Sequence, residues 1–165
     1  MLDIVASFPR ECTASVFIVV REGSQPNHFP ALVNAAGWLP ASYPQDGTRI
    51  EPGRIYIAPP DHQMVLKSRH IWLDPPDAVR HARSAADPLF VSAAEAYGDR
   101  VIGVVLSGAD GESAQGLKAS RDHGGEALVE DPEEAHRPGM SRTALATDCV
   151  SVPEVAKVLR ERCWH

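Results

Sequence analysis

The stretch DPLFVSAAEAYGDRVIGVVLSG, residues 87–108, decides the fold class of this chain. Its first half predicts a helix over residues 87–97, with Asp87 as the N-cap and Pro88 at the first helical position. Its second half contains the clearest buried strand, residues 101–106, an apolar run with several β-branched side chains. A helix that leads directly into such a strand is typical of domains in which parallel strands alternate with helices.

The rest of the chain continues this alternation. The run VFIVV, residues 16–20, predicts a strand buried on both faces, whereas residues 23–60 are rich in loops. Residues 63–67 and 70–73 predict a hairpin at the sheet edge. The other expected elements are strands over residues 55–58, 127–129 and 150–151, and helices over residues 113–123, 141–146 and 153–162. The pattern predicts a single α/β domain over residues 1–165, with a mostly parallel sheet and helices on both faces.

Length and composition fit one soluble domain: 165 residues, of which 44% are hydrophobic and 23% charged. The formal net charge is -6 and no run of Lys or Arg stands out, so we expect no nucleic-acid partner. No stretch approaches the roughly 20 apolar residues of a membrane span. The first residues also lack the pattern of a signal peptide. We therefore expect a cytoplasmic protein that does not insert into a membrane.

Cysteines and histidines give no sign of a metal or cofactor site. Cys12, Cys149 and Cys163 are odd in number and widely spaced, which argues against a disulfide framework and favours free thiols. The seven histidines are scattered, and the sequence contains no C-x-x-C or H-x-x-x-H pair. Because zinc needs convergent ligands, we expect neither a metal nor a cofactor.

Several segments together resemble one family of enzymes. They are VFIVVREG (residues 16–23), QDGTRIEPGRIYIAPPDH (residues 45–62), DPLFVSAAEAYGDRVIGVVLSG (residues 87–108) and GGEALVEDPEEAHRPGMSRTAL (residues 124–145). In order and spacing they are similar to the catalytic domain of CheB-type protein-glutamate methylesterases, over nearly the whole chain. The resemblance implies a doubly wound, Rossmann-like α/β domain. It also implies hydrolysis of receptor glutamate methyl esters by a Ser-His-Asp triad. No receiver-like segment is visible.

The nucleophile that the resemblance implies is missing from its expected motif. The family places its serine in a Gly-Ala-Ser-x-Gly-Gly turn after the first strand, and this sequence contains no such motif. LDIVASFP, residues 2–9, instead resembles the end of the first helix and the stop that follows it. Ser7 is a candidate nucleophile only if residues 4–7 take the place of the strand end. The alternative is an ordinary serine at the end of a helix.

The implied base and acid also differ from the family pattern. Arg21 stands at the position of the family's histidine, and arginine stays charged and cannot act as a general base at neutral pH. His62 lies one position before another family histidine and is expected in a surface loop or hairpin. Asp110 and Glu112 are candidates for the orienting carboxylate, since Glu112 holds its ungapped position and Asp110 keeps the Asp-Gly order. Glu112 could instead serve as a charge beside the next helix N-terminus.

These departures leave three hypotheses. The first is a catalytically degenerate CheB-like domain that binds a chemoreceptor or another signalling protein. The second is a working esterase whose site is rearranged or completed by a partner. The third is anion or nucleotide binding at the Ser107-Gly108 turn, although no P-loop or G-x-G-x-x-G motif is present. We favour the first.

The family pattern also has a consequence for assembly. On that pattern the first strand would lie inside the sheet, and this sequence contains no segment that matches it. Unpaired strand edges and an exposed apolar slot would remain. We therefore expect either a rearranged sheet or a homodimer that covers the gap.

Overall fold

The computed structural model describes six ranges of the chain. They are residues 1–20, 28–74, 86–106, 113–130, 148–150 and 152–162, with the backbone alone described for Ala114, residues 148–150 and Val152. The predicted helix over residues 141–146 lies outside these ranges. All structural statements below refer to the described residues.

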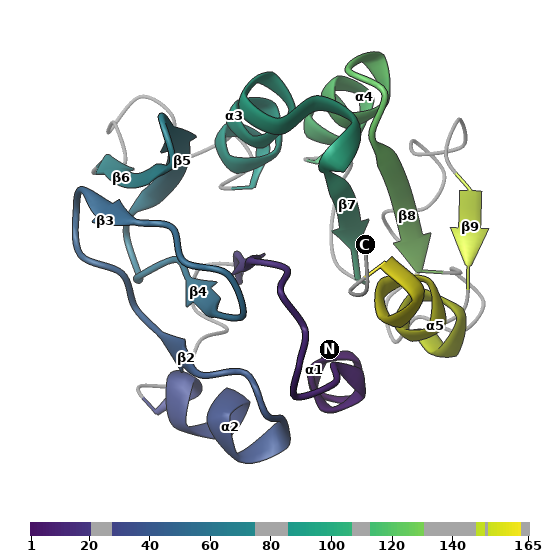
Figure 1. Ribbon diagram of the computed structural model, residues 1–165. Coiled ribbons are helices and arrows are strands. Elements are labelled where there is room, and N and C mark those ends of the chain that lie inside the picture. The colour runs from purple at the N-terminus through teal and green to yellow at the C-terminus, as the bar shows by residue number, and fades with distance from the viewer. Residues whose placement is uncertain (21–27, 75–85, 107–112, 131–147, 151, 163–165) are drawn as a thin grey trace.

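Parallel strands form two separate three-stranded sheets (Figure 1). In the first sheet β4 (Ile55–Ile57) lies between β1 (Val16–Ile18) and β2 (Ala41–Ser42). In the second, β8 (Glu126–Glu130) lies between β7 (Ile102–Val105) and β9 (Asp148–Val150). The mostly parallel α/β architecture predicted from the sequence is confirmed. In the described part of the chain, however, no strand pairing joins the two sheets.

A third sheet is antiparallel. The predicted hairpin is confirmed as β5 (Gln63–Lys67) and β6 (His70–Asp74), joined by a turn in which Ser68 and Arg69 have φ of 52° and 63°. Two successive residues with positive φ are typical of a tight hairpin turn. The hairpin pairs with β3 (Thr48–Arg49) and not with the edge of a parallel sheet, so its predicted place was wrong.

Helices cover both sides of the parallel strands, as the sequence predicts. In Figure 1, α1 (Leu2–Ser7), α2 (Phe29–Ala36) and α5 (Val152–Arg162) lie on one side, and α3 (Asp87–Tyr97) and α4 (Ala114–Asp122) lie on the other. A short 3₁₀ turn, Gly98–Arg100, leads from α3 to β7. The helix α2 and the strands β2 and β3 fall within residues 23–60, where mainly loops were expected.

Packing explains why α2 was missed. The helix begins after His28, whose side chain makes no capping hydrogen bond, and it buries only Phe29 and Val33 on its inner face. The Asn34 side chain donates to the Ala41 carbonyl (2.7 Å) and accepts from the Ala41 N–H (2.9 Å). The side-chain amide of Asn34 therefore bonds both backbone groups of Ala41 at the edge of β2, in the way a neighbouring strand would. This tertiary contact leaves no periodic signal in the sequence.

The core is divided between the two faces of the strands. Ile55 and Ile57 of β4 join the cluster under α1, α2 and α5, while Tyr56 joins the cluster beside the antiparallel sheet and α3. All three side chains are at most 1% exposed. By contrast, the side chains of β1 are only partly buried, although the VFIVV run predicted full burial on both faces. That prediction was wrong, because the side of β1 away from β4 has no paired strand in the described chain.

Two further expectations need correction. Ala86, and not Asp87, is the N-cap of α3, so Asp87 is the first helical residue. Cys12 is buried and disulfide-bonded, which overturns the expectation of free thiols for this residue.

None of the helices in the described ranges has the length and apolar character that a membrane crossing requires.

Candidate functional site at the carboxyl edge of the parallel strands

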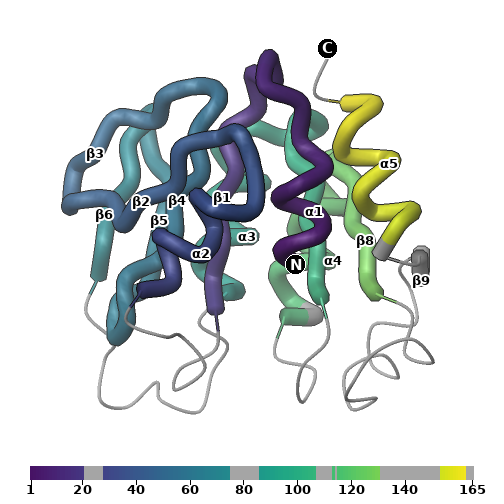
Figure 2. The backbone as a smooth tube through the Cα atoms, turned by 90° about the horizontal axis from the view of Figure 1, so that it is seen from below, coloured from purple at the N-terminus to yellow at the C-terminus, as the bar shows by residue number. Residues whose placement is uncertain are grey.

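The candidate site lies where the parallel strands end. Strands β1, β4, β7 and β8 run in the same direction, so their carboxyl ends lie along one side of the molecule (Figure 2). In open α/β sheets, ligands bind outside this edge, because the connections that follow the strands gather there. Functional side chains are therefore expected directly after the strands.

The predicted site residues have different outcomes. Arg21, Asp110 and Glu112 lie outside the described residues. Val20 and Leu106 are the last described residues before the segments that carry them, and both follow the carboxyl ends of strands, β1 and β7 respectively. The positions and roles of the three candidate side chains remain predictions.

Ser7 lies away from that edge in chain order, because it is the last residue of α1. Its hydroxyl donates a 2.6 Å hydrogen bond to the Ile4 carbonyl one turn earlier. A nucleophilic serine needs its hydroxyl within hydrogen-bond reach of a base, and a backbone carbonyl is not a base of that kind. Ser7 is thus an ordinary serine at the end of a helix, which is the alternative that the sequence of residues 2–9 predicts.

Two described histidines flank the edge. His62 follows β4 in an exposed turn whose neighbour Asp61 has φ of 59°. The His62 Nδ1 lies 2.8 Å from the Pro60 carbonyl oxygen. Since a carbonyl can only accept, the His62 Nδ1 donates this hydrogen bond. His28, the N-cap of α2, is also exposed.

Asp87 links the two helices beside the edge, which the sequence did not predict. Its Oδ1 accepts a 2.9 Å hydrogen bond from the Gly116 N–H in the first turn of α4. A carboxylate at this position satisfies a backbone donor that has no partner within the helix and complements the positive end of the helix dipole. Asp87 thus fixes the first turn of α4 to the first turn of α3.

Close packing reinforces this anchor. A Cβ atom on Gly116 would lie 2.5 Å from the Phe90 Cβ and 2.9 Å from the Asp87 Oδ1. A Cβ on Gly103 in β7 would lie 2.9 Å from the Phe90 ring. Phe90 therefore fills a space that exists only because two glycines face it from different elements. The start of α4 is fixed against both α3 and β7.

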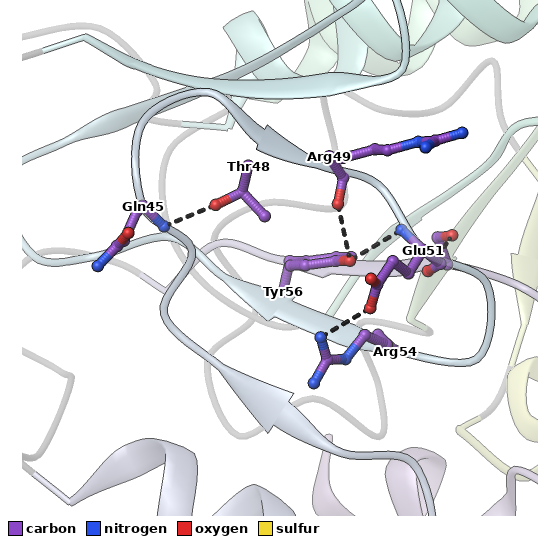
Figure 3. A network of polar contacts seen from close by, with 7 residues as sticks. Gln45, Thr48, Arg49, Glu51, Arg54 and Tyr56 are labelled. Atoms are coloured by element: carbon purple, nitrogen blue, oxygen red, sulfur yellow. Dashed lines mark hydrogen bonds and ion pairs between the residues drawn. The ribbon is translucent and has the colours of Figure 1, made fainter.

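At the opposite edge, a polar network fixes the loop that precedes β4 (Figure 3). The Tyr56 hydroxyl accepts from the Glu51 N–H (2.9 Å) and lies 3.4 Å from the Arg49 carbonyl. The Glu51 carboxylate pairs with Arg54 at 2.8 Å. The Tyr56 ring also stacks on Phe17 of β1, with ring centroids 5.6 Å apart. We assign this network a structural role, because it lies at the amino ends of the strands.

Within the described ranges, no three His, Cys, Asp or Glu side chains come together as a metal site. The site as described thus consists of a strand edge, an anchored helix N-terminus and two exposed histidines. Such an arrangement defines an α/β domain whose candidate site lies at the carboxyl ends of the parallel strands.

Comparison with known proteins identifies the family. The family model for CheB methylesterase matches residues 1–161, and the chain belongs to this family. The chain is 34% identical over 138 residues to a protein-glutamate methylesterase/protein-glutamine glutaminase of Rhodospirillum rubrum, a match that covers 71% of this chain and 35% of that protein. It is 31% identical over 154 residues to a protein of the same description from Caulobacter vibrioides, covering 91% of this chain and 45% of that protein.

A solved structure supports the fold. The chain superposes on the Thermotoga maritima CheB methylesterase catalytic domain with a TM-score of 0.84 and 24% sequence identity, covering 97% of this chain and 90% of that one. The chain spans about a third to a half of the length of the curated relatives it matches, from 33% to 55%. The fold and family resemblance predicted from the sequence are therefore confirmed.

Proposed function

We propose that this chain is a CheB-like domain that binds a signalling partner in chemotaxis and does not hydrolyse methyl esters with its own side chains. The supporting observation is the state of Ser7, whose hydroxyl is bonded to the Ile4 carbonyl inside α1. Acyl transfer needs a nucleophile, a base within hydrogen-bond reach and an orienting acid. Arg21 occupies the position that the family resemblance assigns to the base.

The proposed partner is a chemoreceptor segment that carries methylated glutamates. This choice follows from family membership and from the family resemblance, which implies action on receptor glutamates. The surface that would bind it in this proposal is the carboxyl edge of the parallel strands, where ligands bind in open α/β sheets. In this proposal the domain binds the receptor segment and leaves its esters intact.

A methyl-ester assay tests the proposal directly. The purified protein is mixed with a receptor segment that carries glutamate methyl esters, and methanol release and binding are measured together. We expect saturable binding without release above the buffer rate. Turnover that is abolished by Ser7→Ala or Asp110→Asn would contradict the proposal and support an active esterase instead.

Labelling of serine provides an independent test. A fluorophosphonate reagent reacts with an activated serine and leaves unactivated hydroxyls unmodified. We expect no labelled serine in protein whose circular dichroism shows that it is folded. A single labelled serine, mapped by mass spectrometry, would support the alternative of a working esterase whose site is rearranged or completed by a partner.

A further inference from the structure

The antiparallel sheet turns one face toward the core and the other face outward. On the inner face Met64, Leu66 and Ile71 are at most 3% exposed and belong to the cluster beside α3. Successive side chains of a strand point to opposite faces, so the residues between these three lie on the outward side. None of the outward residues is buried. We call this surface the outer hairpin face and define it by the residues Arg49, Val65, Lys67, His70 and Trp72.

Three basic side chains form a row across the outer hairpin face. The strand register places Arg49 opposite His70, and it places His70 opposite Lys67. Residues that oppose each other across antiparallel strands share a face, with Cβ atoms about 5 Å apart, so the row is about 10 Å long. Figure 3 shows that the Arg49 side chain points away from the polar network around Tyr56. The row is therefore directed outward.

The row has no acidic partner within the described ranges. No ion pair there joins Arg49 or Lys67 to a carboxylate, and the Glu51 carboxylate is paired with Arg54. Asp74, at the other end of β6, lies on the same face but roughly 13 Å along the strand from the row. Like charges that face each other across strands destabilise a sheet. An added negative charge would therefore be stabilised at this row.

Protection of the sheet edges does not explain these cations. Lysine and other charged residues commonly keep edge strands from pairing with other chains. Here the free side of β5 is contacted by α3, whose Ser92 hydroxyl oxygen accepts a 3.0 Å hydrogen bond from the Leu66 N–H. On the free side of β3, the Tyr56 hydroxyl lies 3.4 Å from the Arg49 carbonyl oxygen. Because other parts of the fold contact both edges, the row is available for another role.

An apolar pair lies directly beside the row. Val65 opposes Trp72 across β5 and β6, and these two form the next outward pair after Lys67 and His70. The Trp72 side chain is 44% exposed. Tryptophan is enriched among the residues that dominate binding energy at protein interfaces. The outer hairpin face thus offers positions for an anionic group and for an apolar group about 7 Å apart.

We propose that the outer hairpin face binds a protein segment in which two or three acidic residues are followed closely by an aromatic side chain. The carboxylates pair with Arg49 and Lys67, and the aromatic ring packs against Trp72. A protein segment fits better than a nucleic acid or a lipid surface, because the net charge of -6 repels extended polyanions whereas a short segment responds to the local row. The row lies beside the Tyr56 network at the amino ends of the strands, so this surface is separate from the carboxyl edge and goes beyond the proposed function.

A labelled peptide tests this binding on the unaltered protein. The probe is fluorescein-labelled Gly-Glu-Asp-Glu-Gly-Phe-Leu-Gly, and the matched control replaces Glu-Asp-Glu with Gln-Asn-Gln. We expect fluorescence anisotropy at low ionic strength to show saturable binding of the probe and about tenfold weaker binding of the control. Equal affinities would show that the acidic residues do not matter and would overturn the proposal. Absence of probe binding would also overturn it.

A pair of charge reversals locates the site. Lys67→Glu changes the row, whereas Lys157→Glu makes the same change on an exposed lysine of α5, which lies at the opposite end of the molecule in Figures 1 and 2. We expect Lys67→Glu to weaken probe binding about fivefold or more and Lys157→Glu to leave it unchanged. Equal effects would show that binding follows the net charge alone and would contradict the location. The peptide control keeps the test decisive if Lys67→Glu does not fold.

A pair of tryptophan variants tests the apolar contact. Trp72→Ala removes the ring beside the row, whereas Trp38→Ala removes another exposed tryptophan, 69% exposed, that lies after α2. We expect Trp72→Ala to weaken probe binding about threefold or more and Trp38→Ala to have no effect. Equal affinities of the two variants for the probe would contradict the predicted contact between the aromatic ring and Trp72.

Vesicles distinguish a protein partner from a lipid surface. We expect the protein to co-sediment no more with phosphatidylserine vesicles than with phosphatidylcholine vesicles. Co-sedimentation with phosphatidylserine that Lys67→Glu abolishes, together with absence of probe binding, would replace the proposal with attachment to an anionic membrane. None of these experiments uses a methylated receptor segment, so their outcome is independent of the proposed function.

Discussion

Gly116 shows how one missing side chain fixes the start of a helix. Its Cβ would lie 2.5 Å from the Phe90 Cβ, and neither backbone can move without disturbing the contact between α3 and α4. We expect Gly116→Ala to lower the free energy of unfolding by about 1–3 kcal/mol, the usual cost of overpacking. Urea denaturation measures it. Gln115→Ala, at an exposed position of the same helix, is the control and should change stability by less than ~0.5 kcal/mol.

Two substitutions of Asp87 separate the contribution of its negative charge to stability from that of its hydrogen bond with the Gly116 N–H. Asp87→Ala removes the acceptor for the Gly116 N–H, and we expect a loss of about 1.5–3 kcal/mol in unfolding free energy, typical of a bond to a charged group. Asp87→Asn retains an oxygen acceptor and loses mainly the charge at the helix terminus, so a loss of about 0.3–1 kcal/mol is expected. Equal losses for both variants would show that the charge alone matters.

At the scale of elements, Tyr56 connects the loop before β4 to the strands. Tyr56→Phe keeps the stacking on Phe17 and removes the acceptor of the Glu51 N–H. We expect a loss of about 1–2 kcal/mol and faster hydrogen exchange at the Glu51 amide. Exchange at the Ala58 amide, which donates to the Ile18 carbonyl, is the internal control and should change only with global stability. An unchanged Glu51 exchange rate would show that the hydroxyl does not order this loop.

Elements with a strong periodic pattern were predicted well, and those that depend on contacts were not. The helix over residues 87–97 has the predicted bounds, because Pro88 and the following glycine delimit it locally. The helix α2 was missed because its stability depends on burying Phe29 and Val33 and on the contacts of Asn34 with Ala41. Strands of two residues, such as β2, are formed by their partners and carry no pattern of their own.

At the scale of the molecule, activity depends on groups from several elements. Arg21→His would restore the residue that the family resemblance places after the VFIVV strand. We expect no methyl-ester turnover from this variant, because a base without a nucleophile cannot carry out acyl transfer. Methanol release is the measurement, with the unaltered protein as the control. A rate clearly above that of the unaltered protein would contradict the proposed binding role.

The sequence by itself determined the family, the mostly parallel α/β architecture and the helices on both faces. Those properties follow from runs such as residues 101–106 and from turn residues, which act locally. It also drew attention to Arg21, which needs no coordinates to be excluded as a general base.

Only the tertiary structure decided which strands of the described residues pair with one another. Residues 16–20 have the composition of a fully buried strand, yet they are partly exposed, because burial depends on the neighbours that a strand finds and not on its own side chains. The anchoring of α4 by Asp87 and the division into separate parallel sheets likewise come from contacts between distant segments. The local pattern determines whether a segment is a helix or a strand, and packing determines how deeply that segment is buried.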